Sequence, residues 1–220
     1  MIKYIRLLYY SFYRPKIFFP KKTYSLFKED LFIQKYFKDK NKGFYIDVGS
    51  YHPLEGNNTQ ILYKKGWNGM NFDINEYSIE IFNFLRKRDI NIKSGISNKK
   101  TRIKMFYRKK INMLNTVNKN FARKNFKNGF KEKLVNVNTL NYFMEKNFKK
   151  SKKIDFLNID VEGDEIKVLK SLNFKKYTPN LICIEIHDKF YKKSKVYRFL
   201  INKRYKIAWN IKYSFVFKKI

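Results

Sequence analysis

The stretch Phe156-Leu157-Asn158-Ile159-Asp160-Val161-Glu162-Gly163-Asp164-Glu165 decides how the rest of this 220-residue chain is interpreted. Its first half is apolar enough for a buried strand, and its second half changes to carboxylates and a glycine. The apolar residues that follow have near-helical spacing: Ile166, Val168, Leu169 and Leu172. The stretch therefore predicts a strand, an acidic turn and a helix. In an open α/β sheet such a turn lies where ligands bind, so we expect Asp160 and Glu162 to face a pocket, although an ordinary solvated turn has the same pattern.

Two earlier segments repeat this order of strand, turn and helix. Residues 44–48 form an apolar run that enters a glycine- and proline-containing turn at 49–53, and residues 70–74 form a second strand. We expect Asn57 or Asn58 to cap the helix between them, and Asn75 to cap the next helix. Further strands are predicted at 91–96, 134–140, 154–159 and 181–186, with an antiparallel hairpin at 206–211 and 214–217. Strands that alternate with helices predict a doubly wound, mostly parallel α/β sheet.

The charge of the chain is its strongest compositional signal. Fifty Lys and Arg against 18 Asp and Glu give a formal net charge of +32, which favours an anionic partner. The chain is also rich in Lys, Asn, Ile, Phe and Tyr, whose codons are A/T-rich, so genome composition explains the charge equally well. Residues 90–131 hold thirteen Lys or Arg and no acid. Few arginines and no aromatic RNA-reading motif speak against specific nucleic-acid recognition.

The length suits one domain with a sizeable core. We expect a basic, aromatic segment at residues 1–24 and a single domain at 25–220, in which 90–131 is a substrate-side insertion. Residues 1–22 suit contact with an anionic membrane, or a helix packed on its own domain. Ser25 is expected to cap a helix that carries Ile33. The single cysteine, Cys183, lies among apolar residues and indicates a reducing compartment. Without a spanning apolar run or a cleavage site, we expect a cytoplasmic protein, with the inner face of the membrane as the alternative.

In this basic chain the acids and both histidines fall near predicted strand ends. They are Asp47, Asp73, Asp160, Glu162, Glu185 and Asp188, with His52 and His187. Neither a G-x-G-x-x-G nor a G-x-x-x-x-G-K-[ST] pattern is present, which disfavours dehydrogenases and P-loop enzymes. A carboxylate at the end of the second strand suits a ribose diol, and Asp73 has that position. An acidic glycine turn with a ribose acid suits S-adenosylmethionine, while a capping role for Asp73 is the structural alternative.

Metal binding and nucleophilic catalysis have weaker signals. Glu185, His187 and Asp188 beside Asp160 have the donor atoms for a divalent ion. Because nothing in the sequence fixes a ligand count, we predict no metal site. A Ser-His-Asp or Cys-His nucleophile is not indicated, since Cys183 points to the core and no G-x-S-x-G elbow is present.

Motifs spread over residues 28–186 give the chain a family resemblance. They are Lys28-Glu29-Asp30-Leu31-Phe32, Gly43-Phe44-Tyr45-Ile46-Asp47-Val48-Gly49-Ser50-Tyr51-His52-Pro53, Asn58-Thr59, Leu62-Tyr63-Lys64-Lys65-Gly66-Trp67-Asn68-Gly69, Asn71-Phe72-Asp73, Val137-Asn138-Thr139-Leu140, Ile154-Asp155 with the opening stretch, Leu169-Lys170-Ser171-Leu172 and Ile184-Glu185. With these motifs the chain resembles the FkbM-type S-adenosylmethionine-dependent methyltransferases. The long acidic motif is specific, whereas Asp-Val-Gly alone is weak.

The resemblance implies a Rossmann-like methyltransferase fold of about seven strands, of which the last is antiparallel. It implies methyl transfer to a hydroxyl oxygen, often on a sugar of a bacterial glycan or a natural product. The cofactor residues that it implies are Asp47, Gly49, Ser50 and Thr59 around the cofactor, Asp73 at its ribose, Ser97 near adenine and Asp160 beside the methyl group. Ser50 stands where alanine is frequent in the family, and residues 90–131 match little of it.

The predicted function is therefore O-methylation of a hydroxyl on a sugar, glycan or glycan precursor, with an anionic or carbohydrate acceptor. Asp160 or His187 is expected to act as, or to orient, the base that takes the hydroxyl proton. Histidine has the better unperturbed pKa, whereas the position favours Asp160. The alternatives are an RNA methyltransferase and a non-catalytic basic protein that binds nucleic acid or membrane.

Overall fold

The computed structural model describes residues 5, 7–13, 21–108, 114–148 and 152–220. Helical elements are η1 Tyr9–Tyr13, α2 Glu29–Tyr36, α3 Gln60–Lys64, α4 Glu76–Leu85, α5 Lys119–Asn125, α6 Leu140–Asn147, α7 Glu165–Lys170, η2 Tyr191–Lys193 and α8 Lys195–Asn202. Strands are β1 Phe44–Val48, β2 Asn68–Asp73, β3 Ile90–Lys93, β4 Gly95–Ile96, β5 Thr101–Tyr107, β6 Lys131–Asn138, β7 Phe156–Ile159, β8 Leu181–Glu185, β9 Tyr205–Ile211 and β10 Ser214–Lys219. No helix in these described ranges is long and apolar enough to cross a membrane.

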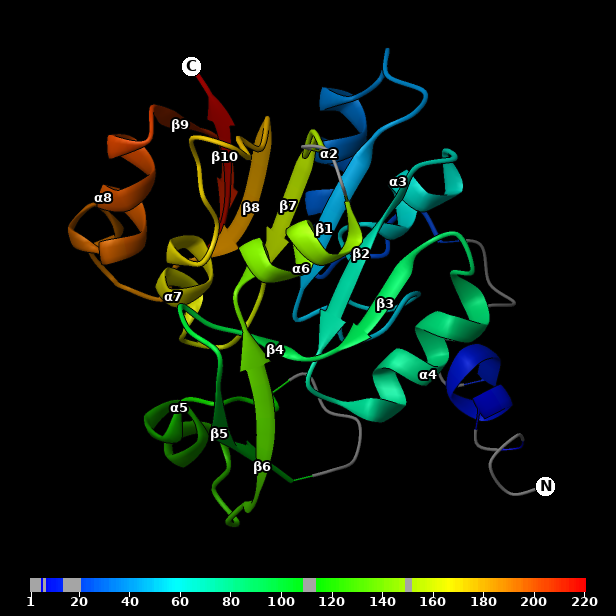
Figure 1. Cartoon of the computed structure of the whole chain (residues 1–220), viewed down its shortest axis with the longest axis vertical. Coiled ribbons are helices and arrows are strands. Elements are labelled where there is room, and N and C mark those ends of the chain that lie inside the picture. The colour runs from blue at the N-terminus through cyan, green and yellow to red at the C-terminus, as the bar shows by residue number, and fades with distance from the viewer. Residues whose placement is uncertain (1–4, 6, 14–20, 109–113, 149–151) are drawn as a thin grey trace.

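A seven-stranded sheet in the order β3-β2-β1-β7-β8-β10-β9 forms the centre of the molecule (Figure 1). The pairs from β3 to β8 are parallel, and β10 pairs with both β8 and β9 in the antiparallel sense. Helices cover both faces of the sheet. The predicted fold class and the predicted C-terminal hairpin are thus confirmed.

Alternation along the strands divides the apolar core into two layers. In β1, Ile46 belongs to the layer that packs on α6, α7 and α8. Tyr45 belongs to the layer on the opposite face, with residues of α2 and α3. Every residue of β1 and β7 is buried because both faces of the sheet are covered there, which explains why these two strands are nearly continuous apolar runs.

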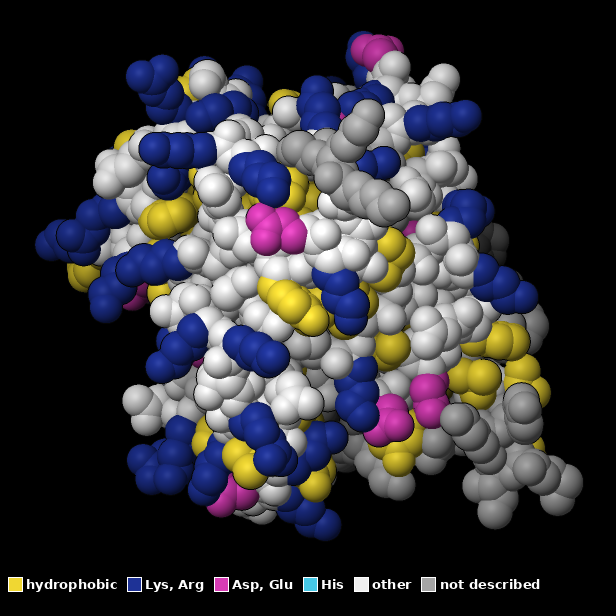
Figure 2. Space-filling model, viewed as in Figure 1, with side chains coloured by type: hydrophobic (Ala, Val, Ile, Leu, Met, Phe, Trp, Pro, Cys, Tyr) yellow, Lys and Arg dark blue, Asp and Glu magenta, His cyan; other side chains and the backbone are white. Residues whose placement is uncertain are grey.

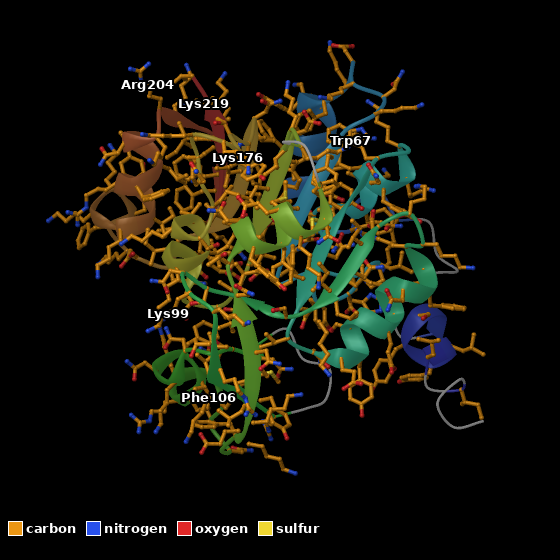
Figure 3. The ribbon with its side chains drawn as sticks, viewed as in Figure 1. Trp67, Lys99, Phe106, Lys176, Arg204 and Lys219 are labelled. Atoms are coloured by element: carbon orange, nitrogen blue, oxygen red, sulfur yellow. The ribbon has the colours of Figure 1, made fainter. Side chains whose placement is uncertain are left out.

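The predicted strand at 91–96 is divided between two sheets. Residues of β3 pair with β2, whereas Gly95 and Ile96 of β4 leave the main sheet and pair with Val137 and Asn138 of β6. A second sheet of order β4-β6-β5 results, and α5 packs on its own small core around Phe106. Figure 3 shows Phe106 in this lower lobe. Trp67, which belongs to the core layer of Tyr45, lies far from it in the same view. The basic segment 90–131 therefore builds most of a separate lobe.

Of two predicted helix caps, one is confirmed and the other is wrong. Asn75 caps α4 as predicted, since its side chain accepts from the amide of Tyr77 at 3.1 Å. The prediction for Ser25 is wrong: α2 begins only at Glu29, and the Ser25 hydroxyl donates to the buried carboxylate of Asp30 at 2.8 Å. The Asp30 carboxylate needs a hydrogen-bond donor because it is completely buried. The contact with Asp30 holds Ser25 outside the helix.

The described part of the N-terminal segment packs on the domain. Leu7 and Tyr10 are half-buried against Tyr51 and Ile81, in agreement with the packed-helix alternative. Residues 1–4, 6 and 14–20 lie outside the described residues, so membrane contact through 1–22 stays a prediction.

Candidate active site

The turn after β1 brings two strands that are distant in sequence into backbone contact. Gly49 has φ +80°, and a Cβ at this position would lie 1.7 Å from the carbonyl oxygen of Asp160. The amide of Asp160 in turn donates to the carbonyl of Val48 at 2.9 Å. Only glycine fits here, because both the left-handed backbone and the neighbouring strand exclude a side chain. The turn therefore joins the ends of β1 and β7.

The side chain of Asp47, two residues before Gly49, is fixed by hydrogen bonds near this turn. Asp47 alternates with Ile46 and Val48, so its side chain lies on the α3 face of the sheet. Its carboxylate accepts from Thr59 Oγ1 at 2.8 Å, from Asn158 Nδ2 at 2.8 Å and from Asn57 Nδ2 at 3.2 Å. Burial raises the pKa of Asp47, while these donors oppose the rise. The predicted cofactor residues Asp47 and Thr59 are thus brought together, but neither lines the pockets described next.

Arg86, at the end of α4, holds the loop that supplies these donors. Its guanidinium is 1% exposed and donates to Thr59 Oγ1 and Asn57 Oδ1 at 2.7 Å each, to the Pro53 carbonyl at 2.9 Å and to Gln60 Oε1 at 3.1 Å. Sequence reasoning missed Arg86, because an arginine in the run Arg86-Lys87-Arg88 has the pattern of an exposed helix end.

The first pocket lies at the carboxyl ends of β1 and β2 and is closed on one side by the small sheet. It contains about 650 Å³ of empty space, the solvent at its mouth included. Its lining combines Gly49, Asp73, Ser78 and Asp160 with apolar side chains from β2, β4, β5, β6 and the segment before α5: Phe72, Ile74, Ile96, Ile103, Val117 and Val137.

Asp73 is one of three acids that line this pocket, with Asp160 and Asp164. Its two carboxylate oxygens accept from the amides of Asn75 at 2.7 Å and Tyr51 at 2.9 Å. Burial raises the pKa of Asp73 to about 7, although both amides oppose the rise. Asp73 thus supports the start of α4, as the capping alternative holds, and it also lines the pocket. The Ser78 hydroxyl is buried without a hydrogen-bond partner among the described residues, so it is available to a ligand.

Two other predicted cofactor residues lie outside the pocket lining. The Ser50 hydroxyl is buried and donates to the carbonyl of Phe72 at 3.3 Å. Ser97 follows β4, and its amide donates to the Asn138 carbonyl at 2.9 Å. Its neighbours Gly95 and Ile96 line the pocket instead. The cofactor roles of Ser50 and Ser97 stay predictions.

A second pocket, of about 300 Å³ of empty space, lies at the ends of β7 and β8. It is more polar than the first and is lined by residues such as Glu29, Asn58, Asn158, Glu185 and Ser214. Asp160 lines both pockets. The half-buried carboxyl group of Asp160 is therefore the point at which the two pockets meet.

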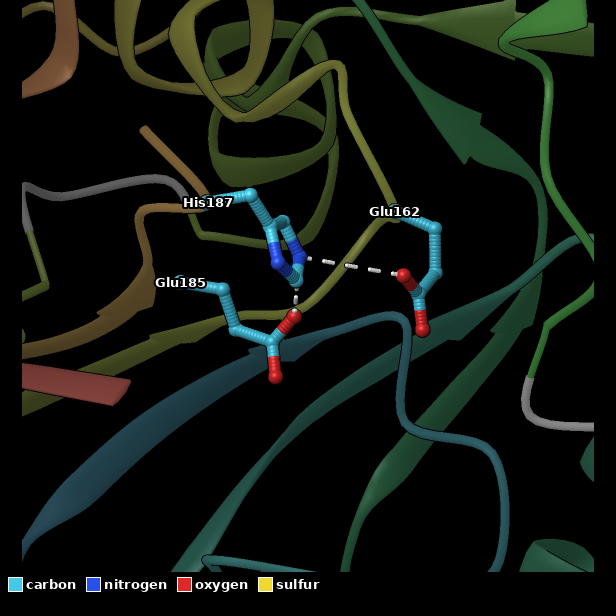
Figure 4. A group of neighbouring side chains, drawn as sticks. All are labelled: Glu162, Glu185 and His187. Atoms are coloured by element: carbon cyan, nitrogen blue, oxygen red, sulfur yellow. Dashed lines mark hydrogen bonds and ion pairs between the residues drawn. The ribbon is translucent and has the colours of Figure 1, made fainter. Parts of the chain in front are cut away.

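The two histidines occupy different places. His52 is completely buried, where its Nε2 lies 2.8 Å from the Tyr10 carbonyl and its Nδ1 accepts from the Leu54 amide. His52 lines neither of the two pockets. His187 is exposed and lies at the second pocket's edge, with its Nε2 3.0 Å from Glu185 Oε2 (Figure 4). Hydrogen bonding to Glu185 raises the pKa of His187. Asp188 is also exposed.

Carboxylates gather around Asp160. Burial raises the pKa of Asp160 well above its ordinary value, and the negative charges of Glu185, Glu162 and Glu165 raise it further. A half-buried carboxyl group with a raised pKa, placed between two pockets at the carboxyl end of a parallel sheet, is typical of an active site.

Comparison with known proteins assigns this arrangement to a family. A search of curated proteins gives no match. A family profile described as the methyltransferase FkbM domain matches residues 47–207, a span that includes Asp47, Asp73, Asp160 and His187. The match covers most of the chain and agrees with the observed sheet order. The chain therefore belongs to the FkbM methyltransferase family.

Proposed function

We propose that the protein is an S-adenosylmethionine-dependent O-methyltransferase that acts on a hydroxyl of a sugar, glycan or glycan precursor. The observation that carries this proposal is the position of Asp160, which lines both a mixed polar and apolar pocket and a smaller polar one. Two reactants in adjacent pockets with a proton acceptor between them are the requirement of an in-line transfer to a hydroxyl.

The first pocket suits the cofactor. Asp73 would hold the ribose hydroxyls, and the Ser78 hydroxyl lies in the same lining. Ile74, Ile96 and Ile103 provide apolar surface for the adenine ring. Gly49, in the turn after β1, lines the same pocket. When bound, the cofactor supplies an electrophilic methyl group on its sulfonium.

Asp160 would accept the hydrogen bond of the acceptor hydroxyl and take its proton as the oxygen attacks. Its raised pKa makes it a stronger base than an exposed aspartate. His187 is less suited to the same task, because it is exposed and lines neither pocket, whereas Asp160 lines both. The proposal therefore prefers Asp160 of the two bases that the sequence suggests.

The surface charge supports an anionic acceptor. Lys and Arg side chains crowd the lower lobe that β5, β6 and α5 build beside the first pocket (Figure 2). Acceptors that carry phosphate or carboxylate groups, such as nucleotide-linked sugars, would be attracted to this lobe.

The test is to incubate the full chain with methyl-labelled cofactor and a panel of nucleotide-linked sugars, glycans and RNA. We expect label in a sugar-containing acceptor, and label in RNA alone would refute the proposal. Asp160→Asn should lower turnover about 10²–10⁴-fold, the usual contribution of a general base. Asp188→Asn, an exposed acid nearby, is the matched control and should keep full turnover. Full turnover in Asp160→Asn would remove Asp160 from the mechanism.

A further inference from the structure

Three metal-ligating side chains lie together at the edge of the second pocket (Figure 4). Glu162 comes from the turn after β7, Glu185 ends β8, and His187 follows two residues later. One donor atom of each lies within 4.8 Å of the other two. His187 Nε2 is 3.0 Å from Glu185 Oε2 and 3.9 Å from Glu162 Oε2.

We propose that Glu162, Glu185 and His187 form a binding site for one divalent first-row metal ion such as Mn²⁺. Neighbouring ligands of an ion with bonds of about 2.1 Å are separated by about 3 Å, and opposite ligands by about 4.2 Å. Both measured separations of His187 Nε2 fall within these limits. The donor atoms of Glu162 and Glu185 lie within 4.8 Å of each other.

The donor set agrees with this class of ion. Two carboxylate oxygens and one imidazole nitrogen suit ions of intermediate softness, whereas sites with oxygen donors alone suit Mg²⁺ or Ca²⁺. Three protein ligands also leave coordination positions open for water or for an oxygen of a bound molecule. Glu185 lines the second pocket, so these open positions would lie at its edge.

The two carboxylates of the cluster have few basic neighbours to balance their charge. In a chain of net charge +32, His187 is the only basic side chain of the described residues in a salt bridge with Glu162 or Glu185. A divalent ion would balance both carboxylates at once.

The turn that carries Glu162 is fixed by contacts from the small lobe. Glu162 has a left-handed backbone with φ +57°, and its carbonyl accepts from Thr116 Oγ1 at 2.9 Å. Asn118 Nδ2 donates to the next carbonyl, of Gly163, at 3.4 Å. These contacts hold the Glu162 side chain toward the other two ligands, so that little conformational entropy is lost on binding.

The metal site deepens the proposed function, and any role of the ion toward an acceptor rests on that function. Metal binding itself is tested without any substrate. The full chain is stripped with a chelator and titrated with Mn²⁺, with free Mn²⁺ followed by electron paramagnetic resonance. We expect one Mn²⁺ per chain, and an affinity at least about tenfold lower in Glu185→Gln and in His187→Gln. Asp188→Asn is the matched control and should bind Mn²⁺ as the wild type does.

Equal Mn²⁺ affinity of wild type and the Glu185→Gln/His187→Gln double variant would overturn the inference. Wild-type protein loaded with Co²⁺ provides a readout that needs no variant: an absorption spectrum identical to that of Co²⁺ in water would also overturn it. Binding of S-adenosylhomocysteine is measured in the same preparation. Cofactor binding without metal binding refutes only the metal site, and metal binding without cofactor binding refutes only the proposed function.

Discussion

Substitution of Gly49 by alanine tests the contact between β1 and β7 at the centre of the site. The new Cβ would lie 1.7 Å from the Asp160 carbonyl oxygen and 2.7 Å from its carbon. Ordinary contacts between carbon and oxygen begin near 3.3 Å, so one strand end must move by roughly 1.5 Å. The cost combines about 1–2 kcal/mol for the left-handed backbone with about 1–3 kcal/mol for overpacking. We expect a loss of about 2–5 kcal/mol in the free energy of unfolding.

Gly129 offers a matched control, because its φ of +78° is nearly that of Gly49 and a Cβ added there would meet no atom within 4 Å. Gly129→Ala should therefore cost only the backbone part, about 1–2 kcal/mol. Both variants are unfolded in urea and followed by circular dichroism, with S-adenosylhomocysteine affinity measured alongside. The difference between the two variants isolates the clash with Asp160. Equal destabilisation, or unchanged cofactor affinity in Gly49→Ala, would refute the reasoning.

Three further predictions concern individual side chains. With a pKa of about 7, Asp73 loses its charge as the pH falls. Cofactor affinity measured by calorimetry should therefore drop about tenfold between pH 7 and pH 5.5, and Asp73→Asn should remove this pH dependence. Arg86→Lys cannot replace four directed hydrogen bonds and should lower the free energy of unfolding by about 2–4 kcal/mol in a denaturant titration; a loss under 0.5 kcal/mol would contradict the role given to Arg86. Cys183 is 2% exposed, and its thiol has a pKa raised by burial, so a disulfide reagent should modify it only at the rate of unfolding, and fast modification of the folded chain would contradict this.

The sequence predicted the main sheet well because its signals are local. Apolar runs that end in acidic or glycine turns mark β1, β2 and β7, and the hairpin at the C-terminus has its own alternating pattern. The positions of Asp73 and Asp160 at strand ends follow directly from those boundaries. Strict alternation also contains information that the prediction did not use: Asp47 stands between two core residues and therefore must point to the opposite face.

The features that the sequence could not show depend on partners distant in the chain. The run at 91–96 is continuous as a pattern, but Gly95 pairs with Val137 in another sheet. Arg86 is buried because acceptors on the α3 loop surround it, and no local pattern contains them. Glu162 joins Glu185 and His187 only because β7 and β8 are neighbours, which is why the sequence groups Glu185 and His187 with Asp188 and Asp160 but not with Glu162.

The position of β1 in the sheet order also affects how the protein is made. Its Asp47 lies beside Asn71 of β2 and Asn158 of β7, and the second of these is 111 residues further along the chain. At ribosomal rates of about 5–20 residues per second, β1 waits roughly 6–20 s for that neighbour. During this interval an apolar Phe-Tyr-Ile-Asp-Val strand has one unpaired edge, and such edges recruit other chains. Slower synthesis would lengthen the wait, so the yield of active protein depends on how well that edge is shielded while the second half of the chain emerges.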